Sequence, residues 1–250
     1  MSKVWFLHVD TLNLPNATTG IVVVKNNTYV TNDTFNCSVI LGRQHRHIRR
    51  IALKSAEIPL GFYNIRAPYN TLTMNIAGTT TTYTFSPGNY SSTTFLNTLN
   101  NTVTPAVGSF FLNTSTNRIQ YTSVVGASSI TGDPGTLGYF LGFTSDQIGV
   151  QIIANKSYCL DFDNYINIYI ENFRNSSSEP YASTFKIPIT VQKGGVQNYF
   201  SDSQFKQSIE IFDPNYKVDR LNIQVRDRFG NPITNNGLDW SFTLELEADN

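Results

Sequence analysis

The sequence predicts an all-β protein, a sandwich of two antiparallel sheets with a smaller module inserted into it. The first observation is a period-two alternation of apolar and polar residues, which is clearest in the last thirty residues. The second is the occurrence of turn-forming residues between these segments at fairly even spacing. The third is composition: only 14% of the 250 residues are charged and 13% are aromatic, whereas an average domain is about 25% charged.

Two strands are predicted near the C-terminus, at 220–226 and 239–247. Each has one apolar face, made by Leu221, Ile223 and Val225 in the first and by Trp240, Phe242, Leu244 and Leu246 in the second. The intervening residues 227–237 are dense in Asp, Asn, Gly and Pro, which favour turns. We therefore expect the chain to end in an amphipathic strand pair joined by a turn.

The first part of the chain predicts an N-terminal arm and two strands. Residues 1–30 are interpreted either as an arm that reaches a neighbouring subunit or as a mobile terminus or first strand. Strands are predicted at 34–42 and 48–60. In the second of these the apolar residues change parity, which predicts a bulge near Lys54 and Ser55.

The middle of the chain, 67–155, predicts an inserted module with the order β-β-α-β-β and then a loop. A hairpin at 72–85 precedes a helix that Ser91 or Ser92 can cap, and a second hairpin follows at 109–125. The helix has one apolar face, formed by Phe95, Leu96, Leu99 and Val103.

The remaining scaffold, predicted as 31–66 and 156–250, resumes with strands at 160–170, 185–191 and 209–211. With the four strands described above, this makes seven predicted scaffold strands. A jelly roll has eight strands in two packed sheets. The missing strand is expected as a short piece near 198–200.

Three segments resemble the penton or minor capsid proteins of virophages, polinton-like elements and related large DNA viruses. They are the C-terminal DRFGNPITNNGLDWSFTLELE, the segment Ser55–Ile65 and the segment Tyr139–Phe143. The resemblance implies a single jelly roll, a structural virion protein without enzymatic activity, and homopentamers at the vertices of an icosahedral capsid. It also implies a neighbouring major capsid protein as partner and the virion as location.

Candidate subunit-interface residues come from the basic stretch 43–50, from Ser55–Ile65 and from the turn near 229. They are Arg43, Arg46, Arg49, Arg50, Glu57, Phe62, Tyr63, Arg228 and Phe229. The basic stretch is interpreted either as an edge that meets acids or phosphates, or as a solvated connection between two strands. Because 18 basic and 18 acidic residues balance, contact with nucleic acid is expected to be minor.

No catalytic, metal or cofactor site is predicted. His45 and His47 are too few for a metal site, and the third histidine, His8, is distant in sequence. Asp161, Asp163 and Asn164 are interpreted either as candidate calcium ligands or simply as a polar strand edge. Five glutamates could supply a glycosidase pair, but no pattern aims two of them together: Glu57, Glu171, Glu210, Glu245 and Glu247.

Cys37 and Cys159 lie in apolar runs and are expected to be buried hydrophobic residues, with a bridge between them left open. We expect neither a secretory signal nor a membrane span. The alternative function is a carbohydrate-binding or host-attachment module, whose sign would be a shallow aromatic pocket with Asp or Asn ligands.

Overall fold

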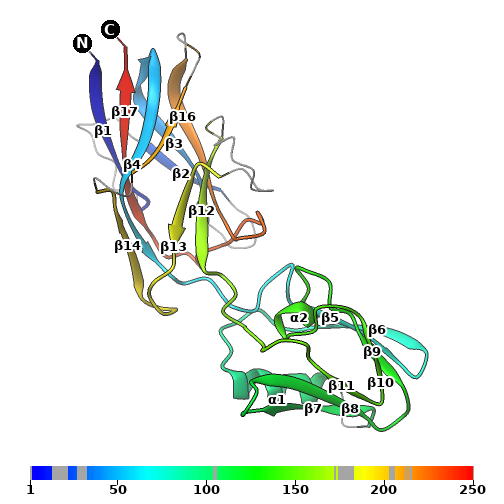
Figure 1. Ribbon diagram of the computed structural model, residues 1–250. Coiled ribbons are helices and arrows are strands. Elements are labelled where there is room, and N and C mark those ends of the chain that lie inside the picture. The colour runs from blue at the N-terminus through cyan, green and yellow to red at the C-terminus, as the bar shows by residue number, and fades with distance from the viewer. Residues whose placement is uncertain are drawn as a thin grey trace. The chain divides into compact units, whose positions relative to one another are not determined.

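The computed structural model of the chain divides into two compact units, which we describe separately. The scaffold unit comprises Met1–Phe62 and Asp163–Asn250, and the inserted unit comprises Tyr63–Phe162 (Figure 1). The sequence had suggested the boundaries 66/67 and 155/156. The structure describes residues 2–12, 22–26, 33–103, 106–171, 173, 183–202, 206–211, 213 and 216–249.

The described scaffold strands form two antiparallel sheets. We call the first the β4 sheet and the second the β16 sheet. The β4 sheet has the order β1 (Lys3–Asp10), β17 (Ser241–Ala248), β4 (Ile48–Pro59) and β14 (Val196–Phe200), and β15 (Gln207–Glu210) also pairs with β4. The β16 sheet has the order β13 (Phe185–Pro188), β12 (Tyr165–Ile170), β16 (Lys217–Arg226), β3 (Asp33–Arg46) and β2 (Val22–Asn26).

This strand order is that of a jelly roll. β14 and β15 pair with successive parts of β4, so they share one position in the sheet. If they are counted together and β2 is treated as an addition, eight strands remain in chain order. One sheet then reads first, eighth, third, sixth, and the other reads second, seventh, fourth, fifth. The predicted all-β fold class is confirmed.

The two sheets enclose one apolar core because their inward-facing residues alternate with outward-facing ones. On β4, Ile51 and Leu53 are buried before residue 54, and Ala56 and Ile58 are buried after it. The pairing of β4 with β17 shifts between these two sets and leaves Lys54 as the extra residue. The bulge predicted near Lys54 is confirmed.

The two C-terminal strands were expected to form an amphipathic pair, but they do not pair with each other. β16 lies in one sheet and β17 in the other, so the residues between them connect the two layers. Alternation shows which face of a strand is buried, but it does not identify the neighbouring strand. In the structure β17 lies between β1 and β4, whereas β16 lies between β12 and β3.

The described part of 1–30 belongs to the sandwich rather than to a separate arm. β1 pairs with β17 along its whole length, and β2 pairs with β3. β1 is therefore the scaffold strand absent from the seven predicted, while the strand expected near 198–200 is β14, which shares its sheet position with β15. Residues 1, 13–21 and 27–30 lie outside the described residues.

The inserted unit contains two sheets and two helices. One sheet has the order β10 (Gln147–Gly149), β9 (Ser128–Ile130), β5 (Thr71–Ile76) and β6 (Thr79–Thr84). The other has the order β11 (Gln151–Ile153), β8 (Arg118–Ser123) and β7 (Gly108–Asn113). The helices are α1 (Ser92–Thr102) and α2 (Leu137–Phe140).

Both hairpins and the helix of this unit lie where the sequence predicted them. Ser91 is the N-cap of α1, and its side chain accepts a hydrogen bond from the Thr94 N–H at 3.2 Å. Three short strands and α2 occupy the region that was expected to be a loop. The predicted strand at 160–170 begins only at Tyr165, and Phe162 instead stacks on Phe140 with ring centroids 3.7 Å apart.

Cys37 and Cys159, between which a bridge was left open, do not form a disulfide bond. Cys37 is buried in the sandwich core, as expected for a small hydrophobic residue, whereas Cys159 is exposed, so the expectation of burial is wrong for Cys159. Within the described residues, no helix is both long and apolar enough to cross a membrane.

Candidate interaction surfaces

The basic stretch 43–50 forms the corner between β3 and β4, which belong to opposite sheets. His47 makes the corner with φ of 56°. Arg43 is exposed and lies 6.0 Å from the Trp5 ring, and His45 meets the same ring edge-on at 5.0 Å. Burial, followed by the charge of Arg43, lowers the pKa of His45. This half of the stretch, together with exposed Arg46, presents cations to solvent.

The other half of the stretch pairs with acids of the same chain. Arg50 contacts Glu245 at 2.7 Å and Glu247 at 2.8 Å, and Arg49 also binds Glu247. The hydrogen bond from Arg49 is the main reason why the pKa of Glu247 is lowered. Arg49 is the extra residue of a second bulge in β4, because the pairing with β17 shifts between Glu247 and Ala248.

Each of the two bulges of β4 therefore adds a cation, Arg49 or Lys54, next to the glutamates of β17. Lys54, the extra residue of the first bulge, lies 3.5 Å from Glu245. A bulge lets its extra side chain join the outward-facing set, which simple alternation would not allow. Of the glutamates that were considered for catalysis, Glu245 and Glu247 are thus engaged in ion pairs, while Glu57 accepts a hydrogen bond from Ser241 and Glu171 accepts one from Asn222.

Two of the three segments that carry the family resemblance meet at Gly61. The Gly61 N–H donates to Asn235 Oδ1 at 2.9 Å, and the Asn236 side chain donates to the Gly61 carbonyl at 2.6 Å. A Cβ atom on residue 61 would lie 2.5 Å from Leu238 Cδ1. Only glycine fits this approach, so the segment after β4 is fixed against the segment before β17.

Phe62 is not available as an interface residue. Its side chain is fully buried in the sandwich core, and Lys193 Nζ lies 3.1 Å from the centre of its ring. The apolar side chain that made Phe62 a candidate for an interface is used for the scaffold's own packing. Tyr63, its neighbour, is half-buried and begins the inserted unit.

The turn that carries Arg228 and Phe229 is organised by a buried carboxylate. Asp227 Oδ1 accepts hydrogen bonds from the N–H groups of Phe229 at 2.8 Å and Asn231 at 2.9 Å. Gly230 adopts φ of 82°, which favours glycine. Arg228 is exposed and lies 5.5 Å from the ring of Phe229, so this turn presents a cation and an aromatic ring.

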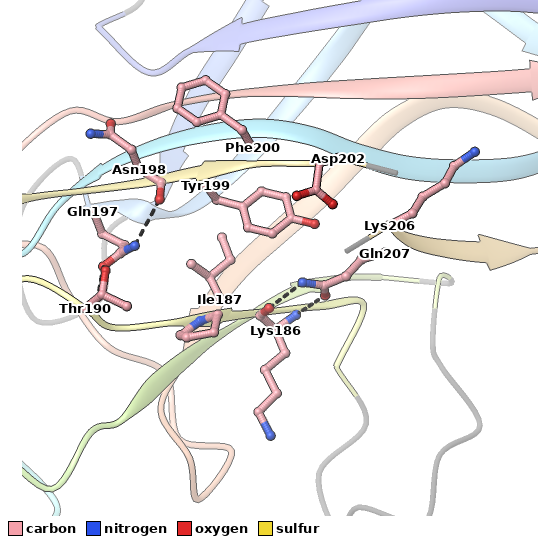
Figure 2. Close-up of a pocket in the computed structure, with 11 residues that line it drawn as sticks. Lys186, Ile187, Thr190, Gln197, Asn198, Tyr199, Phe200, Asp202, Lys206 and Gln207 are labelled. Atoms are coloured by element: carbon pink, nitrogen blue, oxygen red, sulfur yellow. Dashed lines mark hydrogen bonds between the residues drawn. The ribbon is translucent and has the colours of Figure 1, made fainter. Parts of the chain in front are cut away.

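A groove of about 630 Å³ lies between β13 and the β14–β15 edge (Figure 2). Gln207 bridges the edges by accepting from the Lys186 N–H at 2.7 Å and donating to its carbonyl. Gln197 accepts from the Thr190 N–H at 2.7 Å. These side-chain amides satisfy backbone groups that a further strand would otherwise use. The sequence gives no signal for this role, because a bridging glutamine looks like any other surface glutamine.

A second hollow, of about 440 Å³, lies on the outward face of the β16 sheet and is lined mostly by polar side chains. Ser38 donates to Asn222 at 2.8 Å, and Asn222 donates in turn to Glu171. Arg226 lies over the Tyr169 ring at 3.8 Å and binds Gln224. The polar groups of this face are thus bonded to one another across three strands.

The residues considered for metal binding do not form a cluster. Among the described residues, no group of three or more His, Cys, Asp or Glu side chains is placed to hold a metal ion. Asp161 and Asn164 are exposed, whereas Asp163 is buried.

No family model matches the sequence, and no curated protein matches it. Among solved structures, the chain is similar to the selenomethionine-labelled mavirus penton protein, with a TM-score of 0.48 and 9% sequence identity over 100% of each chain. The assignment of a jelly roll stands on the strand order rather than on this likeness.

Proposed function

We propose that this chain is a structural virion protein that forms pentameric capsomers at the vertices of an icosahedral capsid. The observation that carries the proposal is the contact between Gly61 and Asn235. It joins two segments that resemble vertex proteins, and it fixes the chain after β4 against the chain before β17. In this proposal the chain acts by its shape, and it has no catalytic role.

The mechanism is geometric. A heterologous interface, in which two different patches of neighbouring copies meet, closes a ring when each copy is rotated by one fifth of a turn. The exposed cations Arg43, Arg46 and Arg228 are candidates for the polar rim of such an interface, as is half-buried Phe229. The surrounding partner would be a major capsid protein, and the zero net charge favours protein partners over the genome.

The native mass of the purified chain tests the proposal. We expect a species five times the 28.0 kDa chain mass, measured by native mass spectrometry and sedimentation equilibrium. A monomer at all concentrations, or a closed species of another multiple, would contradict the vertex role.

A carbohydrate-binding or host-attachment module is the second candidate. The groove favours it in one respect, since Tyr199, Asn198 and Asp202 line it. Against it, the amides of Gln197 and Gln207 are engaged within the chain and are not placed to bind sugar hydroxyls. Binding of a monomeric chain to a glycan array, lost on replacing Tyr199 by alanine, would favour this candidate.

A further inference from the structure

The outward face of the β4 sheet carries exposed apolar side chains at both of its edges. On β1, Val4 is 47% and Phe6 is 65% exposed. On β14, Val196 is 46% and Phe200 is 66% exposed. We call these pairs the β1 patch and the β14 patch. In the described sheet, β1 and β14 stand at opposite ends of the strand order.

Strand register places both patches on the same face. Phe6 lies opposite Glu245 of β17, and Phe200 lies opposite Ser55 of β4, which is itself opposite Thr243 of β17. Glu245 and Thr243 are two residues apart and therefore point to the same side of the sheet. Figure 2 shows Phe200 and Tyr199 leaving β14 in different directions. Tyr199 packs against the core, so Phe200 faces outward.

The side chains between the two patches bind one another. Glu245 and Glu247 are paired with Arg49, Arg50 and Lys54. Thr243 is within hydrogen-bond distance of His8 at 3.1 Å and of Ser55 at 3.2 Å, and Glu57 accepts from Ser241. The polar side chains that separate the two patches therefore have hydrogen-bond and ion-pair partners within the chain, and their opposite charges largely cancel.

We propose that the β1 patch of one copy packs on the β14 patch of the next copy, and that this is the heterologous contact of the ring. The proposal rests on the proposed function. A heterologous ring needs two different and mutually complementary surfaces on every subunit. These two patches are separate and apolar, and each exposes one valine and one phenylalanine to a similar fraction. The apolar core of a subunit interface is the part that lacks charge. The occupant of each patch is thus a second copy of this chain.

The test uses charge substitution in the full chain. Phe6→Lys and Phe200→Lys each remove one patch and leave the other, so each variant alone is expected to lose the ring and sediment as a monomer. An equimolar mixture retains one intact pairing, the β1 patch of Phe200→Lys on the β14 patch of Phe6→Lys. We expect this mixture to form a heterodimer and nothing larger.

The matched control is Ile148→Lys, because Ile148 is 79% exposed and lies in the inserted unit. It is expected to keep the mass of the unmodified chain. Circular dichroism and thermal unfolding check that the Phe6 and Phe200 variants remain folded, which their exposure favours.

The outcomes separate this inference from the proposed function. If the unmodified chain is a pentamer and both phenylalanine variants remain pentamers, the patches are not the contact, although the vertex role stands. If the two variants disrupt an assembly of another multiple, the patches are the contact and the vertex role fails. A chain that is always monomeric, or a mixture without heterodimer, overturns the inference.

Discussion

The side-chain oxygen of Asn235 accepts a hydrogen bond from the Gly61 N–H at 2.9 Å, and this contact fixes the end of β4 against the chain that leads into β17. The two residues are 174 positions apart in the sequence. Neither is informative alone, since glycine and asparagine are common in turns. Their contact shows that two of the three segments that carry the resemblance lie against each other in the fold.

Gly61→Ala is expected to destabilise the scaffold by about 1–3 kcal/mol, because its Cβ would lie 2.5 Å from Leu238 Cδ1 and 2.9 Å from the Asn235 carbonyl oxygen. Asn235→Ala is expected to cost a similar amount, about 1–3 kcal/mol, because it removes the hydrogen-bond partners of the Gly61 N–H and the Leu238 carbonyl at a part-buried site. Denaturant unfolding followed by tryptophan fluorescence measures this, since Trp5 and Trp240 both lie in the scaffold unit. Asn198→Ala, at an exposed position on β14, is the control. An equal loss of unfolding free energy in this variant would show that the contact between Gly61 and Asn235 has no special role in stability.

Asp227→Ala is expected to destabilise the scaffold by about 2–4 kcal/mol. The substitution leaves the N–H groups of Phe229 and Asn231 without their carboxylate acceptor at a fully buried position. The neighbouring Arg228→Ala is the control, because Arg228 is exposed, and it should change the free energy of unfolding by less than about 0.5 kcal/mol. Equal unfolding midpoints for the two variants would show that the carboxylate does not organise the turn.

Much of the fold could be predicted because it depends on local patterns. The alternation of apolar residues, the change of parity at Lys54 and the serine cap of α1 are all readable over a few residues. The neighbour of each strand could not be predicted in this way. The alternation in β16 and β17 is equally compatible with a hairpin and with strands in two sheets.

The candidate interface could be predicted less well, for a physical reason. Sequence shows that Phe62 is aromatic and that Arg50 is basic, but not whether the partner lies in the same chain. Phe62 is used by the core, and Arg50 is used by β17. Conversely, Phe6 and Phe200 resemble ordinary strand residues until the pairing register places them on the outward face.

Arg50 and Arg49 are adjacent, but their replacement by methionine is expected to have unequal effects. The Arg50 side chain is only 18% exposed and contacts both Glu245 and Glu247, so Arg50→Met should destabilise the scaffold by about 2 kcal/mol. The Arg49 side chain is 48% exposed, and water screens its charge, so Arg49→Met should cost clearly less than Arg50→Met, although it removes the hydrogen bond to Glu247. Chemical denaturation of the two variants in parallel tests this, and an effect of Arg49→Met as large as that of Arg50→Met would contradict it.

The lowered pKa of Glu247 predicts acid sensitivity. The folded state holds the carboxylate ionised, mainly through the hydrogen bond from Arg49, so its folded-state pKa lies below the ordinary value of 4.5. A depressed pKa stabilises the fold at pH values above the ordinary one, and this contribution disappears as the pH falls through the folded-state value. The free energy of unfolding should therefore decrease on acidification below about pH 4.5. Glu247→Gln should reduce that decrease, and an unchanged pH profile would contradict the assignment.

Gln207→Leu is expected both to destabilise the scaffold and to promote aggregation. The side chain keeps nearly the same volume, but the Lys186 N–H and carbonyl lose the two hydrogen bonds that now cover the outer edge of β13. The lost bonds should cost about 1–3 kcal/mol. An uncovered strand edge can also pair with other chains, because its backbone groups are then unsatisfied.

Light scattering under native conditions, together with denaturant unfolding, measures both effects. Gln192→Leu, which adds the same apolar side chain at an exposed position of the scaffold, should leave both unchanged. If Gln192→Leu aggregates as much as Gln207→Leu, added surface hydrophobicity rather than the open edge is responsible.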